Sequence, residues 1–144
     1  MSQVERAWPP PDVGQFVWCR FPDLSVLKPG RKQRPALILR VFDDEAPVYR
    51  VLVAYGTSQR TDKLFAGEFR LAASDGEAFR LAGLSSTTKF NLAAHVELPF
   101  TDTWFVPPPG SPHGQTPKLG ILHSSVYRRV EAAWKVVDSL RGSA

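Results

Sequence analysis

Two apolar segments joined by a short acidic turn constrain the fold of this chain more than any other feature. Residues 35–42 (PALILRVF) form a nearly continuous apolar run, which is typical of a strand covered on both faces. Residues 43–47 (DDEAP) are turn formers, and residues 48–55 (VYRVLVAY) have the pattern of a second strand of similar length. The three segments together predict an antiparallel hairpin.

Shorter strands are expected on both sides of this hairpin. Each candidate is a short run of β-branched, aromatic or alternating residues bounded by proline, glycine or a polar turn. The candidates are residues 14–21, 67–72, 88–98 and 101–105. In the first of them, Cys19 falls on an inward-facing position and is expected to be buried filler.

The end of the chain has a different periodicity. Its apolar residues recur at steps of four, three, four and three, which puts one stripe on an amphipathic helix of about four turns. They are Val126, Val130, Ala133, Val137 and Leu140. Short strands followed by one terminal helix predict a mainly β (α+β) fold: a small antiparallel barrel or half-barrel with the helix packed against it.

Length and composition limit the class of protein. A chain of 144 residues with 43% hydrophobic and 22% charged residues fits one folded domain spanning residues 1–144. Residues 1–13 are expected to be an irregular lead-in, and residues 106–118 a proline-rich loop. No run approaches the roughly 18 apolar residues of a membrane span, so we expect a cytoplasmic protein with no membrane segment.

Several kinds of chemistry lack their sequence signals. A single cysteine excludes an internal disulfide and a cysteine-cluster zinc site, and the three histidines stand at no metal-ligand spacing. Phosphate-loop, dinucleotide-binding, zinc-protease and nucleophile-elbow motifs do not occur. We therefore expect no metal and no cofactor. The net charge of +4 is compatible with nucleic acid but does not by itself indicate it.

Arg34 is the first candidate for a functional residue. It precedes Pro35, which forces it into an extended conformation at a strand entrance, and it follows a cationic loop containing Arg31 and Lys32. A planar guanidinium there suits a phosphodiester. The structural alternative is a solvated arginine beside a hairpin.

Thr57 is the second candidate, in the segment Gly56-Thr57-Ser58-Gln59 at the end of the second hairpin strand. Such residues hydrogen-bond a ligand or, alternatively, cap a turn. In an antiparallel hairpin the start of one strand lies beside the end of its partner. Arg34 and Thr57 are therefore expected to meet at one open end of the sheet.

The order of these segments resembles the PemK/MazF family of toxin ribonucleases over about residues 14 to 141. The matching segments are GQFVWCRFP (14–22), RPALIL (34–39), VAYGTSQ (53–59), GL (83–84) and the terminal helix. The resemblance implies an SH3-like barrel, a homodimer, metal-independent and sequence-specific cleavage of single-stranded RNA, and neutralisation by a cognate antitoxin protein.

The resemblance also implies roles for particular residues. It puts the family's essential arginine on Arg34 and its threonine or serine on Thr57, with Ser58 as the fallback. An acidic residue that some members use falls nearest to His95. This residue is the candidate base because imidazole titrates near neutrality, and the alternative is a structural histidine, since the sequence shows no partner for it. Substrate contacts are expected from Arg31, Lys32, Ser58, Gln59 and Lys89.

Cleavage without a metal requires the 2′-hydroxyl to attack the adjacent phosphorus, and Arg34 is suited to stabilise the resulting five-coordinate dianion. Three aromatic residues have two interpretations, stacking on unpaired bases or packing in the core: Trp18, Phe90 and Trp104. For the whole chain the alternative is an SH3-like barrel that binds nucleic acid or a peptide without cutting it.

Overall fold

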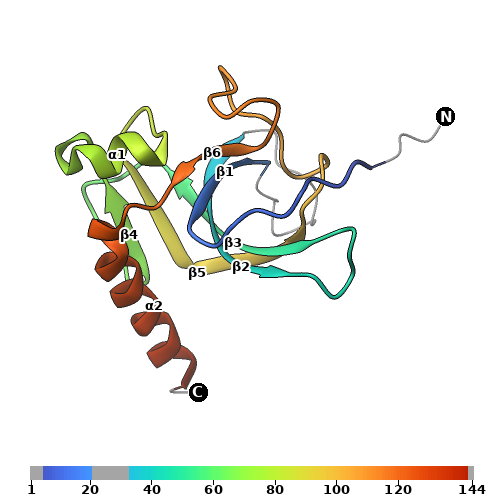
Figure 1. Ribbon diagram of the computed structural model, residues 1–144. Helices are drawn as coiled ribbons and strands as arrows, with labels where there is room; N and C mark the ends of the chain where they lie inside the picture. Colours follow the sequence, from blue (N-terminus) through green and yellow to red (C-terminus); the bar gives the residue numbers. More distant parts are fainter. Residues whose placement is uncertain (1–4, 21–32, 143–144) are drawn as a thin grey trace.

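The computed structural model describes residues 5–20 and 33–142. Six antiparallel strands form one curled sheet in the order β4-β5-β3-β2-β1-β6 (Figure 1). The strands are β1 (Gln15–Cys19), β2 (Arg34–Phe42), β3 (Arg50–Thr57), β4 (Glu68–Leu71), β5 (Thr88–Pro99) and β6 (Lys118–Ile121). The helices are α1 (Glu77–Ala82) and α2 (Tyr127–Gly142). The expected mainly β fold, a small barrel-like sheet with a C-terminal helix, is confirmed.

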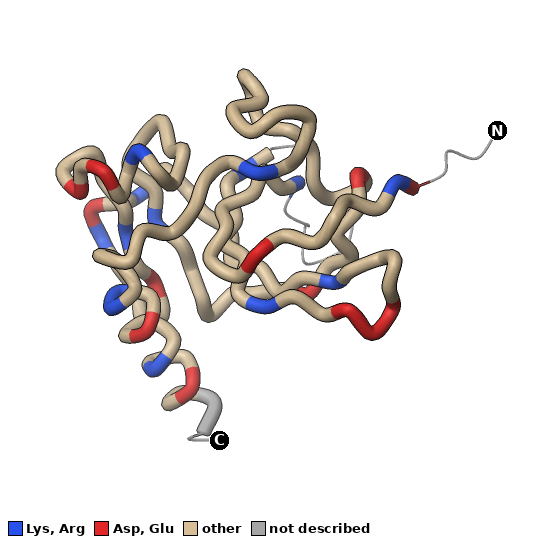
Figure 2. The backbone as a smooth tube through the Cα atoms, viewed as in Figure 1, with Lys and Arg blue, Asp and Glu red and all other residues tan. Residues whose placement is uncertain are grey.

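The central hairpin is β2 with β3. The two strands pair antiparallel, with Leu37 opposite Ala54 and Val41 opposite Val51. Figure 2 shows the acidic residues 43–45 together in the turn at the tip of this hairpin. Arg34 is the first residue of β2 and therefore lies at the opposite end of the hairpin. The hairpin predicted from the two apolar runs is therefore confirmed, and it separates its negative charges from the arginine.

The sheet separates two hydrophobic clusters. One, here called the helix-side cluster, contains Phe16 and Leu37 together with Ala133 and Val137 of α2. The other, here called the lead-in cluster, contains Val17, Cys19, Ile38, Val53, Trp8 and Phe105. Successive residues of a strand point to opposite faces, so β1 and β2 each supply both clusters. Both faces of the central strands are thus used for packing.

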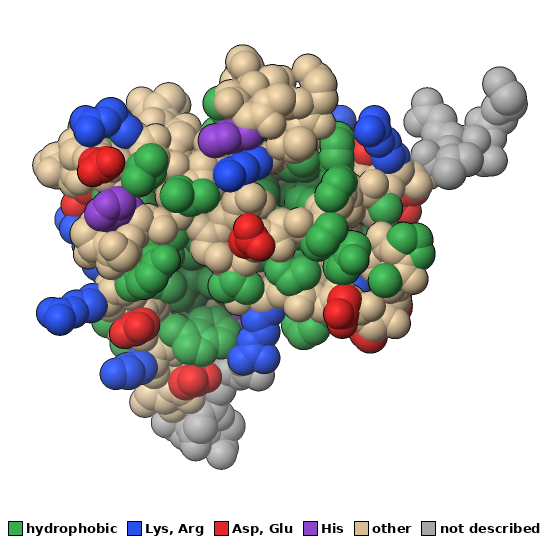
Figure 3. All heavy atoms as spheres, viewed as in Figure 1, with side chains coloured by type: hydrophobic (Ala, Val, Ile, Leu, Met, Phe, Trp, Pro, Cys, Tyr) green, Lys and Arg blue, Asp and Glu red, His purple; other side chains and the backbone are tan. Residues whose placement is uncertain are grey.

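The terminal helix is confirmed, but its stripe is shorter than expected. Val126, Ala133 and Val137 are buried, whereas Leu140 is 59% exposed and lies outside the core. Apolar side chains also show on the surface between α2 and the sheet in Figure 3. A hollow of about 320 Å³ lies at this boundary, lined in part by Leu92 and Trp134.

The lead-in is irregular from residue 5 to residue 13, as predicted, but it is fixed to the sheet. Trp8 is 6% exposed, and its indole N–H donates to the Phe105 carbonyl at 2.9 Å. The expected strand at 101–105 is wrong. The N–H groups of Trp104 and Phe105 both donate to the Thr101 carbonyl, which makes this segment a turn with isolated bridges at its two ends.

Two short elements, α1 and β6, were not predicted. They pack backbone to backbone: a Cβ on Gly83 would stand 2.2 Å from the Leu119 carbonyl oxygen, and a Cβ on Gly120 would stand 2.2 Å from that of Leu81. Gly83 also has φ of 75°, which ends α1 in the left-handed conformation that glycine adopts most readily. β6 begins at the last residue of the predicted proline-rich loop, so the loop ends at Pro117.

Within the described ranges, no helix combines the length and the apolar character needed to cross a membrane.

Candidate functional site

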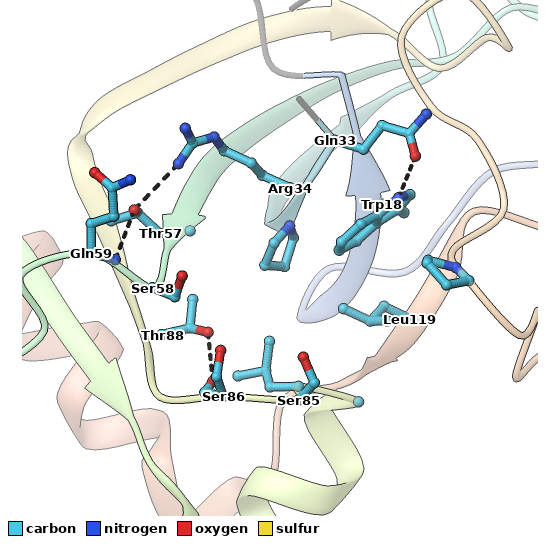
Figure 4. Close-up of a pocket in the computed structure, with 15 residues that line it drawn as sticks. Trp18, Gln33, Arg34, Thr57, Ser58, Gln59, Ser85, Ser86, Thr88 and Leu119 are labelled. Carbon is cyan, nitrogen blue, oxygen red and sulfur yellow. Dashed lines mark hydrogen bonds between the residues drawn. The ribbon is translucent and has the colours of Figure 1, made fainter. Parts of the chain in front are cut away.

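A cavity of about 450 Å³ opens where β2 begins and β3 ends (Figure 4). Strand ends, the turn after α1, the proline-rich loop and β6 all contribute to its wall. The lining residues are Trp18, Gln33, Arg34, Pro35, Gly56, Thr57, Ser58, Gln59, Gly83, Leu84, Ser85, Ser86, Thr88, Pro109 and Leu119. The predicted residues Arg34, Thr57, Ser58 and Gln59 are among them.

Arg34 and Thr57 meet at the mouth of this cavity. Ala36 pairs with Tyr55, so the register continued by two residues puts Arg34 opposite Thr57. Nη1 of Arg34 donates a hydrogen bond to Oγ1 of Thr57 at 3.2 Å. The guanidinium also lies 5.7 Å from the centre of the Tyr55 ring, a cation–π contact that steadies it. The hairpin geometry therefore brings the two predicted side chains together.

The hydroxyl of Thr57 accepts twice. Its Oγ1 receives the Arg34 hydrogen bond and a second one from the backbone N–H of Gln59, also at 3.2 Å. A hydroxyl has two acceptor positions and one proton to donate. With both acceptor positions engaged, what Thr57 can offer a ligand is its O–H proton. It is thus arranged to donate to an anionic oxygen and not to accept a proton.

Trp18 supplies the aromatic part of the wall. It stands opposite Pro35 in the β1–β2 register, and its indole N–H donates to Oε1 of Gln33 at 2.8 Å. An indole N–H can only donate, so this contact orients the amide and leaves the NH₂ group of Gln33 for other partners. Leu84 and Leu119 extend the apolar surface. A flat unpaired base fits such a wall.

The remaining polar groups come from the turn after α1. Ser85 and Ser86 are exposed there, and Thr88 donates to the Ser86 carbonyl at 2.8 Å. Among the lining residues that the structure describes there is no carboxylate and no imidazole. Nor do the described residues contain a group of three or more His, Cys, Asp or Glu side chains able to hold a metal ion. The cavity can bind an anion, but its described wall holds no base that titrates near neutrality.

His95 is not brought to the cavity. It lies opposite Ala54 of β3. The register of the β3–β5 pair shifts after Ala54, so Gly56, which lines the cavity, is opposite Phe90 and not a residue next to His95. A carbonyl only accepts, so Nδ1 of His95 donates to the Leu92 carbonyl at 2.7 Å. The imidazole ring packs 5.5 Å from the ring of Trp134 in α2. The structure thus gives His95 a place in the packing of the helix on the sheet.

Lys89 also takes a different place from the expected one. It is 6% exposed, forms an ion pair with Glu68 at 3.2 Å and donates to the Lys63 carbonyl at 3.0 Å. A buried and paired ammonium is not available to an RNA backbone at the cavity. The predicted contacts Arg31 and Lys32 lie outside the described residues.

Of the remaining candidate residues, one lines the cavity and the others lie in the hydrophobic core or pack against it. Trp18 lines the cavity, whereas Phe90 is fully buried between Phe16 and Phe69 and Trp104 packs against the lead-in cluster. Burial raises the pKa of the Cys19 thiol far above its ordinary value, so this cysteine stays protonated and is no nucleophile.

Sequence reasoning missed several lining residues. Ser85 and Ser86 directly follow the Gly83-Leu84 pair, and that adjacency was the available signal for them. Leu119 had none, because β6 is four residues long and contains a glycine.

No protein-family model matches the sequence, and no curated protein matches it at a significant level.

Proposed function

We propose that this protein is a metal-independent endoribonuclease that cleaves single-stranded RNA. The observation that carries the proposal is the Arg34–Thr57 hydrogen bond at the mouth of a cavity with an aromatic wall. A guanidinium binds phosphate oxygens through a planar fork, and the Thr57 hydroxyl is oriented to donate to a further oxygen. The face of Trp18 fits a base only when that base is unpaired, which favours single-stranded RNA.

In the proposed reaction the 2′-oxygen attacks the adjacent phosphorus and the bond from phosphorus to the 5′-oxygen breaks. The 2′-hydroxyl proton passes to hydroxide or water, and the leaving oxygen takes a proton from water. The products are a 2′,3′-cyclic phosphate and a 5′-hydroxyl end. Arg34 stabilises the dianionic five-coordinate phosphorus, a contribution of about 10²–10³ in rate for one such contact.

The biological setting follows from the resemblance to PemK/MazF toxins. The order of the sequence segments and the barrel-like fold with its C-terminal helix support it. Under this proposal the chain is a cytoplasmic toxin that forms a homodimer, recognises a short RNA sequence, and is neutralised by a cognate antitoxin protein. No metal or cofactor takes part.

Incubation of the purified protein with a long single-stranded RNA in EDTA tests the activity. The native protein should give discrete fragments with cyclic phosphate ends, and Arg34→Ala should lose about 10²–10³ in rate. Arg40→Ala is the matched control, because Arg40 is an exposed cation on the same strand outside the cavity. Equal cleavage by native protein and Arg34→Ala would overturn the proposal.

A second candidate function is binding of single-stranded RNA without cleavage. It is favoured by the described wall of the cavity, which offers an arginine, hydroxyls and an aromatic face but neither carboxylate nor imidazole. Binding titrations beside the cleavage assay separate the two candidates. RNA that binds in an Arg34-dependent way and stays intact, across RNAs of varied sequence, would identify a binding module.

A further inference from the structure

Two neighbouring cations, Arg70 and Lys89, lie directly opposite each other on β4 and β5. Both reach the segment that follows Thr57, residues 58–66. Nη1 of Arg70 donates to the Thr61 carbonyl at 2.5 Å, and Nζ of Lys89 donates to the Lys63 carbonyl at 3.0 Å. Two strands of the sheet therefore hold one connecting segment by its backbone.

Paired cations repel each other unless a negative charge compensates them. Glu68 supplies that charge: its carboxylate lies 3.2 Å from Nζ of Lys89, and both side chains are 7% exposed. Oε1 of Glu68 also accepts the backbone N–H of Phe65 at 2.7 Å, and the Phe65 ring stands 5.1 Å from the ammonium. The buried ammonium of Lys89 is thus contacted by the Glu68 carboxylate, the Lys63 carbonyl and the Phe65 ring.

The same segment begins at the cavity. Thr57 is opposite Lys89 in the β3–β5 register, and the N–H of Gln59 donates to the Thr57 hydroxyl. One end of the segment therefore orients the Thr57 hydroxyl, and the other end is fixed by Lys89. The held carbonyls of Thr61 and Lys63 are only two and four residues beyond Gln59, so they limit how far the Gln59 N–H can move from Thr57.

We infer that Lys89, with Glu68 and Arg70, is a positioning residue that holds residues 58–66 so that the Thr57 hydroxyl keeps its orientation. It does so without touching RNA. The effect on catalysis rests on the proposed ribonuclease function, whereas the effect on the segment does not.

The double variant Lys89→Met/Glu68→Gln tests the inference. It removes both charges of the buried Lys89–Glu68 ion pair together, so neither partner of that pair is left buried without the other, and it keeps an acceptor for the Phe65 N–H. We expect kcat for RNA cleavage to fall about 10²-fold, the scale of a 1 Å misplacement, with little change in KM. Lys89→Arg, which keeps the cation, should retain most of the activity.

The matched control is Arg50→Met/Glu97→Gln. It removes an exposed ion pair of 2.9 Å between β3 and β5, at the end of these two strands that is far from Thr57 and Lys89. Its kcat should equal that of the native protein. If Lys89→Met/Glu68→Gln has the same kcat as this control, the catalytic part of the inference is overturned.

Limited trypsin digestion measures how often residues 58–66 open, in the absence of RNA. Arg60 and Lys63 are exposed trypsin sites within it. Cleavage after these residues should speed up at least about tenfold in the double variant and stay at the native rate in the control, because opening of the segment is local. Unchanged cleavage would overturn the inference. Native protein that cuts no RNA would overturn the proposed function alone, since the digestion still decides the positioning role.

If the double variant does not fold, the rate of trypsin cleavage can instead be compared between Phe65→Ala and the native protein. Phe65 is 56% exposed, and its truncation removes the ring over Lys89 without disturbing the ion pair. Faster cleavage after Lys63 in this variant supports the inference, and the native rate contradicts it.

Discussion

Arg34 and Thr57 are 23 positions apart in the sequence and are joined by a 3.2 Å hydrogen bond between their side chains across β2 and β3. The bond does more than bring a cation to the cavity. Together with the Gln59 N–H it occupies both acceptor positions of the Thr57 hydroxyl, and so it decides which way the hydroxyl can act.

Thr57→Val is the sharpest test of this orientation. Valine keeps the shape of threonine but has no proton to donate, so we expect the rate of RNA cleavage to fall about 10²-fold. Thr57→Ser keeps the hydroxyl and should retain activity within about tenfold. Rates are measured on one RNA, with thermal melting of each variant to verify folding. A fully active Thr57→Val would show that the hydroxyl does not act.

The place of His95 leads to a prediction on pH. Because its imidazole packs on Trp134 and does not line the cavity, His95→Ala should leave the shape of the pH–rate profile unchanged. The rate should rise with hydroxide concentration, without an inflection in the range near pH 6.5 where histidine titrates. An inflection that is present in the native protein and lost in His95→Ala would return His95 to the mechanism.

Stability in acid should depend on the Asp75–Arg129 ion pair. The hydrogen bond from Arg129 at 2.5 Å holds the pKa of Asp75 below its ordinary value. A depressed pKa means that the ion pair stabilises the fold above about pH 4, the value for an unfolded aspartate, and that this contribution is lost as pH falls through the lower folded value.

The free energy of unfolding in urea, measured at a series of pH values from 6 downward, gives the size of that loss. The series starts at pH 6 because this is about two units above the pKa of aspartate in the unfolded chain. In Asp75→Asn the fall in the free energy of unfolding between pH 6 and acid should be smaller than in the native protein, by up to about 1 kcal/mol. The effect is no larger because Arg129 is 44% exposed and solvent screens the ion pair. Glu97→Gln, in the exposed ion pair with Arg50, is the control. If the free energy of unfolding of Asp75→Asn falls with pH as much as that of the native protein, the prediction is contradicted.

Gly120→Ala should destabilise the fold. The added Cβ would stand 2.2 Å from the Leu81 carbonyl oxygen and 2.4 Å from the Ala82 carbonyl carbon, and these backbone atoms move only if α1 moves. We expect a loss of about 1–3 kcal/mol in the free energy of unfolding, as for other overpacked sites. Ile121→Ala is the neighbouring control, since Ile121 is 43% exposed. Equal urea midpoints for native protein and Gly120→Ala would contradict the tight contact.

The sequence was informative where local pattern decides structure. Two apolar runs and the turn between them define the hairpin, Pro35 fixes the extended conformation of Arg34, and hairpin geometry then requires Arg34 to meet Thr57. The stripe on α2 is readable for the same reason, because a period of 3.6 residues repeats over sixteen residues.

The parts that could not be predicted depend on contacts between distant segments. The position of His95 follows from a register shift in the β3–β5 pair, which leaves no mark in the sequence. Lysine is rarely buried, and Lys89 is buried because Glu68 and the Lys63 carbonyl satisfy it. At six and four residues, α1 and β6 are too short for their periodicity to stand out.

The division of the sheet between two hydrophobic clusters has a consequence for how this protein could be altered. Packing uses both faces of the central strands. The apolar part of the cavity wall also belongs to this packing, because Leu119 is a member of the helix-side cluster. By contrast, Gln33, Ser85 and Ser86 of the same wall are exposed and belong to neither cluster. These three positions can therefore be changed without removing a core side chain. Under the proposed function, a library randomised at Gln33, Ser85 and Ser86 would sample new RNA preferences with the core unchanged, and the chain would then be a starting point for engineered RNA recognition.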